Sequence, residues 1–571
     1  MKHFERPQPK LALMRLVDCI ARLNSKQEDQ TAWIERTSAA SAEPASKEPA
    51  NELSKGSISA NTQSSPKKWT WGDLRERTAS TAIRLLQLGV EPQDRICNLG
   101  RNSLDWAILD LACSAINAIH VPIDARLGHA SCQACIDRVE PKLLFVDEKS
   151  NLTAYSCQQV LALQSLNTIS KGVSLDQCCV PYHEEDVANI LFTSGTTSAH
   201  KGVMLSHRNL VSNAMAKLDA MPQVADDHRL NFLPFSHAYA RTCELSTWLL
   251  SQSSMEVVHG IDSVLAHANT AHPTLINGVP LFFERLHSLW EDPSNGCDHS
   301  DSARSLGNIL GPKIRRLASG GAPIRNVLRA RFADAGLPVF QGYGLTETSP
   351  VVCSNRSSNS IGTNQWSSEI LTEVGPVVQG VQIKIDADTK LWVKGNGVMK
   401  GYWNDPSETQ RRIVDGWLDT GDLAEYVPSE DETESASIRI LGRADDTIVL
   451  STGYKIFPLA IEQLLRSQAW VSECMIVGHD RPYSILLLKP NVDKLLVATK
   501  ERLESMLLDW LPSILKSYPS YAIPKAVLVC QEYWTPQSGL TNFKGGLRRK
   551  KIEAFYSTAI DQKYQESKSI S

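Results

Sequence analysis

Short apolar strands alternate with helical segments over most of the chain, and this alternation restricts the fold more than any other feature. DRICNLG, DWAILDLACSAINA and IHVPID follow one another in the order strand, helix, strand. The same pattern continues through KLLFVD, VANILFT and PTLINGV. Apolar strands that alternate with helices are typical of parallel sheets covered by helices. We therefore expect an α/β fold whose large N-terminal domain has mostly parallel sheets flanked by helices.

The pattern changes after about residue 440. Short strands in TIVLSTGYKIFP, ECMIVGHD, SILLLKP and AVLVC are there combined with helices in IEQLLRSQ and LESMLLDWLPSIL. A chain of 571 residues is also too long for one ordinary domain. We expect an N-terminal domain over residues 1–443 and a small α+β C-terminal domain over residues 444–571.

Residues 37–67 contain hardly any large apolar side chains. Such a segment cannot bury enough surface to offset its ordering entropy, so we expect a disordered insertion. It separates TAWIER from KWTWGDL, which suggests a hairpin with a long loop. In the helix that follows, LRERTASTAIRLLQLG, we expect Ala79, Ala82, Ile83 and Leu86 to share one face and Gly89 to end the helix.

Charge and hydropathy exclude several classes of protein. A net charge of −4 gives no general attraction to polyanions, so nucleic acid is not expected as a partner. No apolar run approaches the roughly 20 residues that span a bilayer. The run from Leu11 to Val17 is interrupted at Arg15 and followed by Asp18, which favours an amphipathic helix over a signal peptide. We expect a cytoplasmic protein and leave contact with a membrane surface open.

The thirteen cysteines are scattered and odd in number, unlike a disulfide framework. Cys132 and Cys135 form one CxxC with no second pair at zinc-site spacing. We interpret them as two small residues one helical turn apart rather than as a metal or redox site.

The segment LFTSGTTSAHKGVMLSH follows a buried strand with a loop rich in hydroxyl groups. Gly195 and Gly202 let the backbone bend, and Lys201 adds a positive charge; the hydroxyls belong to Thr193, Ser194, Thr196, Thr197 and Ser198. Amides, hydroxyls and an ammonium suit a polyphosphate, although the loop is not a Walker A motif. A plain Ser/Gly turn is the alternative.

Four further segments carry polar residues next to glycines. In QGYGLTETSP, Tyr343 lies between two glycines, Thr346 offers a hydroxyl, and Glu347 offers a carboxylate suited to Mg²⁺. In GWLDTGDLA, Asp422 either accepts both ribose hydroxyls or stabilises its own turn. Arg443 lies at the expected domain boundary, where a solvated linker charge is the alternative, and Lys544 lies in GLTNFKGGLRRKK. We interpret residues 548–551 as a solvated basic face.

In this order and spacing, the segments resemble the adenylate-forming (ANL) superfamily of acyl-CoA synthetases, luciferases and peptide-synthetase adenylation domains. The resemblance extends from Trp69 to Lys551. LPFSHAYARTCE, INGVPLFFERL, LASGGAPI, VMKGYW and VGHDRPYSILLLKP are most similar to the long-chain fatty acyl-CoA synthetases. Peptide-synthetase domains place an aspartate where LPFSH stands, so the acid is not expected to be an amino acid.

The resemblance implies roles for individual residues. It implies Mg²⁺ positioned by Thr193 and Glu347, a hinge at Asp445, and a loop around Gly453 that faces coenzyme A. It implies catalytic roles for Lys544, His237, Thr346 and Glu347, with His237 beside the reacting carboxylate. The ATP and AMP site that it implies consists of Thr193, Ser194, Gly195, Thr196, Thr197, Lys201, Gly321, Ala322, Tyr343, Thr346, Asp422 and Arg443.

The chain departs from the family pattern at several positions. Ser198 stands where glycine is usual in the phosphate loop, and His200 where proline is frequent. Thr389 and Lys390 replace a usual Gly-Glu. Lys544 is one residue farther from the following arginine than usual, which leaves Lys550 or Lys551 as alternatives.

The implied activity is ATP-dependent ligation of a fatty, long-chain acid to coenzyme A through an acyl-AMP, with Mg²⁺ as cofactor and a C-terminal domain that rotates between the two steps. The alternatives are a fatty acyl-AMP ligase that delivers the acyl group to a carrier protein, and a non-catalytic protein that binds an acyl or adenylate ligand. Chain length and oligomeric state are left open.

Overall fold

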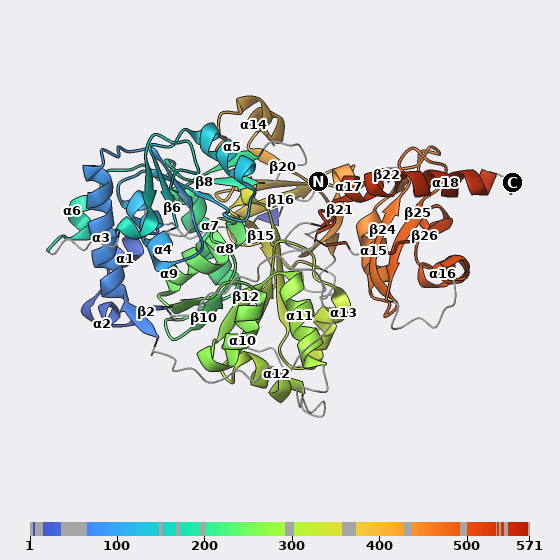
Figure 1. The fold of residues 1–571 in the computed structure, drawn as a ribbon, viewed down its shortest axis with the longest axis horizontal. Coiled ribbons are helices and arrows are strands. Elements are labelled where there is room, and N and C mark those ends of the chain that lie inside the picture. Colours follow the sequence, from blue (N-terminus) through green and yellow to red (C-terminus); the bar gives the residue numbers. More distant parts are fainter. Residues whose placement is uncertain are drawn as a thin grey trace.

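The computed structural model describes residues 4–5, 15–35, 66–147, 152–166, 172–193, 200–291, 302–356, 373–427, 437–491, 500–532, 534–535, 538–541 and 546–568. Three sheets and their helices form the larger part of the molecule, and the elements from residue 448 onward form a smaller part beside it (Figure 1). The expected α/β class is therefore confirmed.

The first sheet has seven strands and is parallel in its centre. β8, β5, β4, β6 and β7 run parallel, while β9 pairs antiparallel with β8, and β18 with β9. The strands, in spatial order, are β18 (Gly401–Tyr402), β9 (Lys201–Ser206), β8 (Val187–Thr193), β5 (Ile119–Ile123), β4 (Arg95–Leu99), β6 (Leu143–Val146) and β7 (Val160–Ala162).

The second sheet has eight strands, six of which form a parallel block with one antiparallel strand at each edge. The strands, in spatial order, are β15 (Val351–Ser354), β14 (Val339–Gly344), β13 (Arg316–Ser319), β12 (Leu275–Gly278), β10 (His228–Asn231), β11 (Ser254–Val257), β2 (Thr31–Glu35) and β3 (Lys67–Thr70). Among these, β2 and β3 form the expected hairpin, in which Glu35 lies opposite Lys67. The predicted insertion at residues 37–67 falls, except for its last two residues, outside the described residues.

The third sheet is antiparallel throughout. We did not expect a fully antiparallel sheet from the sequence, which predicted mostly parallel sheets. Its strands are β1 (Phe4–Glu5), β16 (Val381–Ile385), β17 (Lys390–Gly395), β20 (Trp417–Val427), β19 (Ile413–Val414) and β21 (Ser437–Arg443). Short turns join β16 to β17 and β19 to β20, and strands joined by a short turn pair antiparallel.

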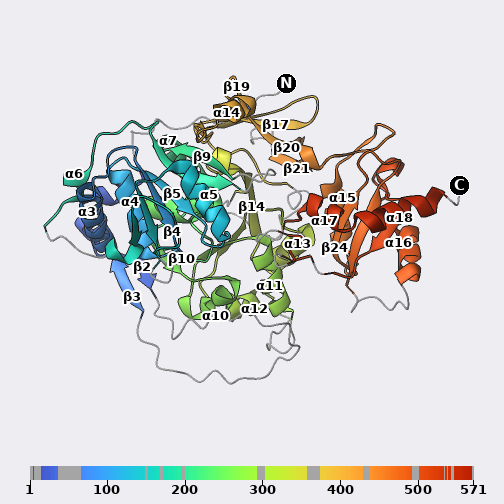
Figure 2. The same cartoon turned by 45° about the horizontal axis from the view of Figure 1, so that its top comes forward.

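Helices cover the two mostly parallel sheets. The longer ones are α3 (Trp71–Gln87), α4 (Leu104–Ala115), α5 (His129–Val139), α7 (His207–Ala220), α10 (Ile261–Ala271), α11 (Pro280–Trp290), α12 (Ser302–Leu310) and α13 (Asn326–Asp334), which Figure 2 shows from a second side. The shorter ones are α1 (Asp18–Ala21), α2 (Ser25–Glu28), α6 (Leu175–Cys178), α8 (Ala238–Ala240), α9 (Thr247–Ser251) and α14 (Pro406–Arg412), with a π-helix, η2, at Arg241–Ser246.

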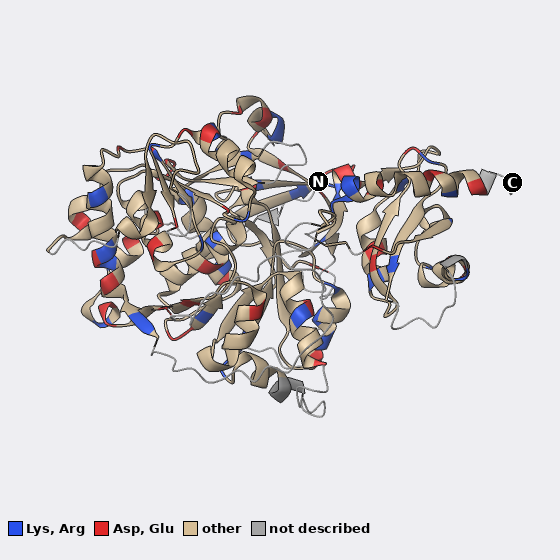
Figure 3. Cartoon of the chain, in the orientation of Figure 1, with Lys and Arg blue, Asp and Glu red and all other residues tan. Residues whose placement is uncertain are grey.

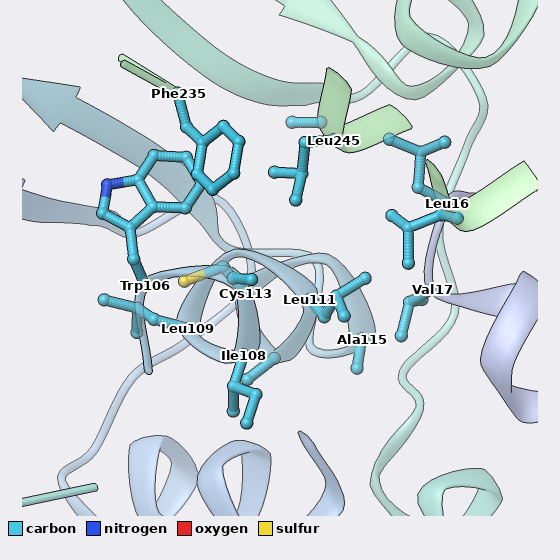
Figure 4. Packing of buried hydrophobic residues seen from close by; sticks show 14 of the residues in the cluster. Leu16, Val17, Trp106, Ile108, Leu109, Leu111, Cys113, Ala115, Phe235 and Leu245 are labelled. Carbon is cyan, nitrogen blue, oxygen red and sulfur yellow. The ribbon is translucent and has the colours of Figure 1, made fainter. Parts of the chain in front are cut away.

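The core between the helices and sheets is closely packed around α4. Trp106 lies against Phe235 with ring centroids 5.2 Å apart, and apolar side chains continue along α4 toward Leu16 and Val17 (Figure 4). Leu16 and Val17 were expected within an amphipathic helix, but the helix α1 begins only at Asp18. Both side chains are nevertheless buried.

Helix α3 ends at Gln87 with Leu88 as its C-cap, and Gly89, the expected stop, follows with a φ of +77°. Its buried face includes Ala79, Ala82 and Leu85, whereas Leu86 is 38% exposed. Leu86 therefore lies at the edge of the buried face, which continues through Leu85.

Cys132 and Cys135 lie one turn apart on α5, and both are buried among apolar residues. They pack in the core, in agreement with their interpretation as small helical residues. Figure 3 shows basic and acidic residues interspersed over the helices of the molecule. In the part of the chain that the structure describes, no helix is long and apolar enough to cross a membrane.

The C-terminal part has its own apolar clusters, composed only of residues from 448 onward. Its principal sheet joins β24 (Val471–Val477), β25 (Ile485–Pro490) and β26 (Ala526–Val529), and β22 (Ile448–Val449) pairs with β23 (Lys455–Ile456). The helices are α15 (Pro458–Arg466), α16 (Lys500–Ile514), α17 (Arg549–Phe555) and α18 (Ser557–Lys568). This arrangement confirms the expected smaller α+β C-terminal domain.

Candidate active site

A cavity of about 320 Å³ opens where several strands end. It is lined by Thr193 at the end of β8, Ser319 at the end of β13, and Gly344 at the end of β14. The carboxyl ends of strands are the usual place for a ligand in an open α/β sheet. The cavity also receives residues from the antiparallel sheet, which places all three sheets around one site.

Asp422 is a buried carboxylate held between two predicted site residues. Tyr343 donates its phenolic hydrogen to Asp422 Oδ2 over 2.6 Å, and Arg443 Nη1 donates to Asp422 Oδ1 over 2.9 Å. The strand register brings them together, since Asp422 on β20 pairs with Arg443 on β21. Burial and the adjacent negative charge raise the pKa of Tyr343 well above its usual value, so the phenol stays protonated. Burial alone would lower the pKa of Arg443, but Asp422 raises it overall.

Each oxygen of Asp422 retains acceptor capacity after these bonds, because a carboxylate oxygen has two lone pairs. Tyr343, Arg443 and the neighbouring Gly421 line the cavity, whereas Asp422 itself is buried beside them and does not line it. The free lone pairs of this fixed carboxylate are suited to the hydroxyl groups of a ligand such as a ribose.

Thr346 and Glu347 begin a short 3₁₀ helix, η4 (Thr346–Thr348), directly after β14. Both line the cavity. Tyr402 donates a 2.9 Å hydrogen bond to Glu347 Oε1, and burial together with this carboxylate raises the pKa of Tyr402. Glu347 is thus positioned by a residue that the sequence did not identify.

The donor set suits a magnesium ion held jointly with a ligand. Thr193 and Glu347 contribute a hydroxyl and a carboxylate to the same cavity, and oxygen donors are what Mg²⁺ prefers. No cluster of three or more His, Cys, Asp or Glu side chains suitable for a metal occurs within the described ranges. Mg²⁺ commonly takes one or two carboxylates and completes its shell with phosphate and water.

Lys201 is held by Glu408, which the sequence analysis missed. Lys201 Nζ lies 2.6 Å from Glu408 Oε1, and Arg411 also donates to this carboxylate from one turn farther along α14. Hydrogen bonds from Arg411 and Lys201 lower the pKa of Glu408 to about 2. The spacing in PSETQRR could equally belong to a surface helix, so the sequence held no signal for this contact.

Residues 194–199 lie outside the described part of the chain, including the predicted Ser194, Gly195, Thr196 and Thr197. The two ends of this loop are described. Thr193 and Lys201 are register partners on β8 and β9, and both line the cavity.

His237 precedes α8 and lines the same cavity. Its Nε2 lies 2.9 Å from Asp124 Oδ2 and 3.0 Å from Arg126 Nη2. Burial alone would raise the pKa of Asp124, but hydrogen bonds from His237 and Arg126 lower it well below its usual value. Asp124 follows β5, a buried strand far away in sequence, and it fixes the orientation of the imidazole.

The other predicted residues fall into three groups. Gly321, with a φ of +78°, and Asp445 line the cavity, whereas Ala322 does not. Gly453, with a φ of +87°, lies in the turn between β22 and β23, away from the cavity. Lys544 lies outside the described residues.

Lys550 and Lys551, the alternatives to Lys544, are both exposed on α17. Neither lines the cavity. Their placement is that of a solvated helix face and gives neither residue a contact with the site.

Comparison with known proteins agrees with this geometry. Residues 48–403 match the family described as AMP-binding enzyme, and residues 445–568 match the AMP-binding enzyme C-terminal domain. A long-chain-fatty-acid–CoA ligase of Mycobacterium bovis is 26% identical over 470 residues, which cover 72% of this chain and 76% of the relative. A feruloyl-CoA synthase of Amycolatopsis is 29% identical over 500 residues, which cover 84% and 94%.

Two further comparisons concern the acceptor of the acyl group and the fold. A chloroplastic long-chain-fatty-acid–[acyl-carrier-protein] ligase of Arabidopsis thaliana is 25% identical over 618 residues, covering 87% of this chain and 83% of the relative. ATP-bound MatB from Rhodopseudomonas palustris shares the fold with a TM-score of 0.73 at 22% identity, covering 95% and 99%. The match to the family spans more than half of the chain, and the chain therefore belongs to the AMP-binding enzymes.

Proposed function

We propose that the protein ligates a fatty, long-chain carboxylic acid to coenzyme A at the expense of ATP. A carboxylate oxygen of the acid attacks the α-phosphorus of ATP, and the bond from this phosphorus to the bridging oxygen breaks, releasing pyrophosphate. The thiol sulfur of coenzyme A then attacks the acyl carbon, its proton is lost to solvent, and AMP leaves.

The observation that carries the proposal is the constellation around one cavity. Asp422, fixed by Tyr343 and Arg443, offers acceptors for a ribose, while Thr346 and Lys201 offer donors for phosphate oxygens. Little covalent chemistry is required of these groups, since positioning and charge stabilisation suffice for phosphoryl-centred transfer. A bound Mg²⁺ would neutralise charge on the phosphates between Thr193 and Glu347.

His237 is the residue we assign beside the reacting carboxylate. Its ring is oriented by Asp124, and no covalent role is needed for it. Lys544 is assigned to stabilise charge in the first step, from a C-terminal domain whose boundary we place between Arg443 and Ala444. The separate apolar clusters from residue 448 onward support this boundary.

The test is acid-dependent ATP–pyrophosphate exchange, followed by detection of AMP and thioester. We expect exchange with free fatty acids and thioester only when coenzyme A is added. Exchange with any acid excludes a non-catalytic binding protein. The likeness to the Arabidopsis ligase supports one alternative acceptor, so acyl carrier protein is assayed beside coenzyme A. Transfer to the carrier alone would replace coenzyme A in the proposal.

A further inference from the structure

Lys217 is a buried amine on α7 that lines the same cavity, and the predicted site does not include it. The residue is only 6% exposed. Its Nζ lies 2.8 Å from Met221 Sδ and 2.9 Å from Ser354 Oγ. These partners are a thioether and a hydroxyl, neither of which carries a charge.

The hydrogen-bonding capacity of Lys217 is not used up by these contacts. The Ser354 hydroxyl donates to the Asn355 carbonyl over 3.0 Å, so toward Lys217 it acts as an acceptor. An ammonium has three donors, and two acceptors leave one donor for an occupant of the cavity. None of the contacts found for Lys217 in the described ranges is with a carboxylate.

The neighbouring cavity residues do not neutralise this charge. Tyr239 and Cys243 line the cavity with Lys217. Burial raises the pKa of the Cys243 thiol to about 11 and that of the Tyr239 phenol well above its usual value, so both groups stay neutral near pH 7. Burial lowers the pKa of Lys217 itself, as expected for an ammonium without a counter-ion.

We relate Lys217 to the acid rather than to the nucleotide because of the residues that line the cavity with it. His237 precedes the helical segment that carries Tyr239 and Cys243. An acid whose carboxylate lies beside His237 and whose remainder passes Tyr239 and Cys243 approaches the Lys217 ammonium. Leaving a buried donor opposite a plain hydrocarbon is unfavourable, because a polar group without a partner loses its hydration.

We propose that Lys217 binds a second oxygen of the substrate acid, so that the enzyme prefers acids with a hydroxyl, carbonyl or second carboxylate group over matched unsubstituted acids. This inference rests on the proposed function, since it needs the acid to be activated in this cavity. It names the class of acid that the cavity selects.

The test is ATP–pyrophosphate exchange with matched sets of acids from about four to sixteen carbons, supplemented by phenylpropanoic acids. Each set contains the unsubstituted acid, its hydroxy and oxo forms at several positions, and the dicarboxylic acid. We expect the wild type to favour at least one oxygenated acid by roughly tenfold to a hundredfold in kcat/KM, the range of a hydrogen bond to a charged group. Lys217→Met should abolish this preference and leave the unsubstituted acid as good or better.

Matched variants separate the ammonium from packing. Lys217→Gln keeps a donor and should retain part of the preference. Met221→Leu removes the thioether acceptor and changes the packing beside Lys217 but leaves the ammonium in place, so the preference should be retained. Wild-type preference for unsubstituted acids in every set would overturn the inference, whichever variants fold. So would an equal loss for both acids of a pair in a folded Lys217→Met protein. Absence of exchange with any acid would overturn the proposed function itself, and this inference with it.

Discussion

Asp422 is the residue on which the proposed nucleotide site depends most. Asp422→Asn removes the charge that holds Arg443 and leaves an amide opposite the Tyr343 hydroxyl. Hydrogen bonds to charged groups contribute about 1.5–3 kcal/mol, so we expect the KM for ATP to rise roughly tenfold to a hundredfold. Tyr343→Phe should raise the KM for ATP by a smaller factor, because the hydrogen bond from Arg443 to Asp422 remains. Pyrophosphate exchange at varied ATP tests both variants, and equal losses would show that the phenol has a role beyond orienting Asp422.

Thr389 adopts a φ of +62°, a conformation that costs a non-glycine residue about 1–2 kcal/mol. It lies in a turn stabilised by Asp386, whose Oδ1 accepts from the amides of Asp388 and Lys390. Thr389→Gly removes the clash but adds chain entropy on unfolding, so we expect a net gain of about 0.5–1 kcal/mol. Ala387→Gly in the same turn, where φ is not positive, should destabilise. Urea unfolding measures the free energy of unfolding of both variants. A loss of stability in Thr389→Gly would contradict the inference that the backbone of Thr389 is strained.

The sequence predicted many residues of the candidate site but few of their partners. Tyr343, Glu347 and Asp422 stand in recognisable segments within or next to strands, so their approach to one another could be expected; Tyr343 and Glu347 line the cavity, and Asp422 is bonded to Tyr343. Tyr402 and Glu408 reach the site only because β18 pairs with β9, a contact between distant segments. No local pattern in the sequence encodes such a pairing. No local pattern singles out Lys217 as a cavity residue either.

At the scale of elements, helix α14 places Glu408 against Lys201. The pKa of Glu408 is lowered, so the stability that its charge provides is present above the ordinary glutamate pKa of about 4.3 and is lost as pH falls through about 2. We expect wild type and Glu408→Gln to differ by about 1 kcal/mol in unfolding free energy between pH 5 and 8. By pH 3 the difference should shrink to about half.

Urea unfolding from pH 3 to 8 checks this behaviour. Arg411→Gln serves as a control that keeps the Lys201 contact. A difference between wild type and Glu408→Gln that grows toward low pH would contradict the assigned direction of the pKa shift.

We expect residues 38–65 to be dispensable, because they lie between the paired strands β2 and β3. The pairing of Glu35 with Lys67 brings the two ends of the strands together, so a short turn can join them. Loop length changes closure entropy only slowly, by about 0.6 kcal/mol per doubling. We expect the shortened protein to keep its melting temperature and its exchange activity. A deletion extended through Trp33, which is 2% exposed, should unfold the protein and provides the contrast. Normal folding without exchange in the shorter deletion would assign the segment a function.

The elements differ in how far the sequence could predict them. β4, α4, β5 and β8 were recognisable because buried parallel strands and their helices have distinct patterns. The antiparallel sheet was not recognised because buried, intermediate and exposed residues are mixed along its strands, as in β17 and β21, and no continuous apolar run marks them. β16 pairs with β1, a strand of two residues near the start of the chain, and no local sequence pattern predicts a pairing between such distant segments.

At the scale of the whole molecule, Asp445 lies where the two parts of the chain join. It belongs to the 3₁₀ helix η5 (Ala444–Asp446), between β21, which carries Arg443, and the β22–β23 hairpin, which carries Gly453. Asp445 also lines the cavity, so a change in its backbone angles acts directly at the site. Hinges commonly concentrate large dihedral changes in a few such residues at the ends of elements.

Asp445→Pro tests whether the proposed cycle needs rotation about this residue. Proline fixes φ near roughly −65° and restricts the preceding Ala444, so one orientation of the C-terminal domain should be retained. We expect a folded variant to keep one half-reaction and lose most of the other, with thioester formation from supplied acyl-adenylate the more affected. Asp445→Ala, which keeps the backbone free, controls for the side chain. Lys544→Ala should show the reverse pattern, losing adenylate formation by roughly a hundredfold while still consuming supplied acyl-adenylate. Equal loss of both half-reactions in folded Asp445→Pro would place the pivot elsewhere, and equal survival would mean that catalysis proceeds without the rotation.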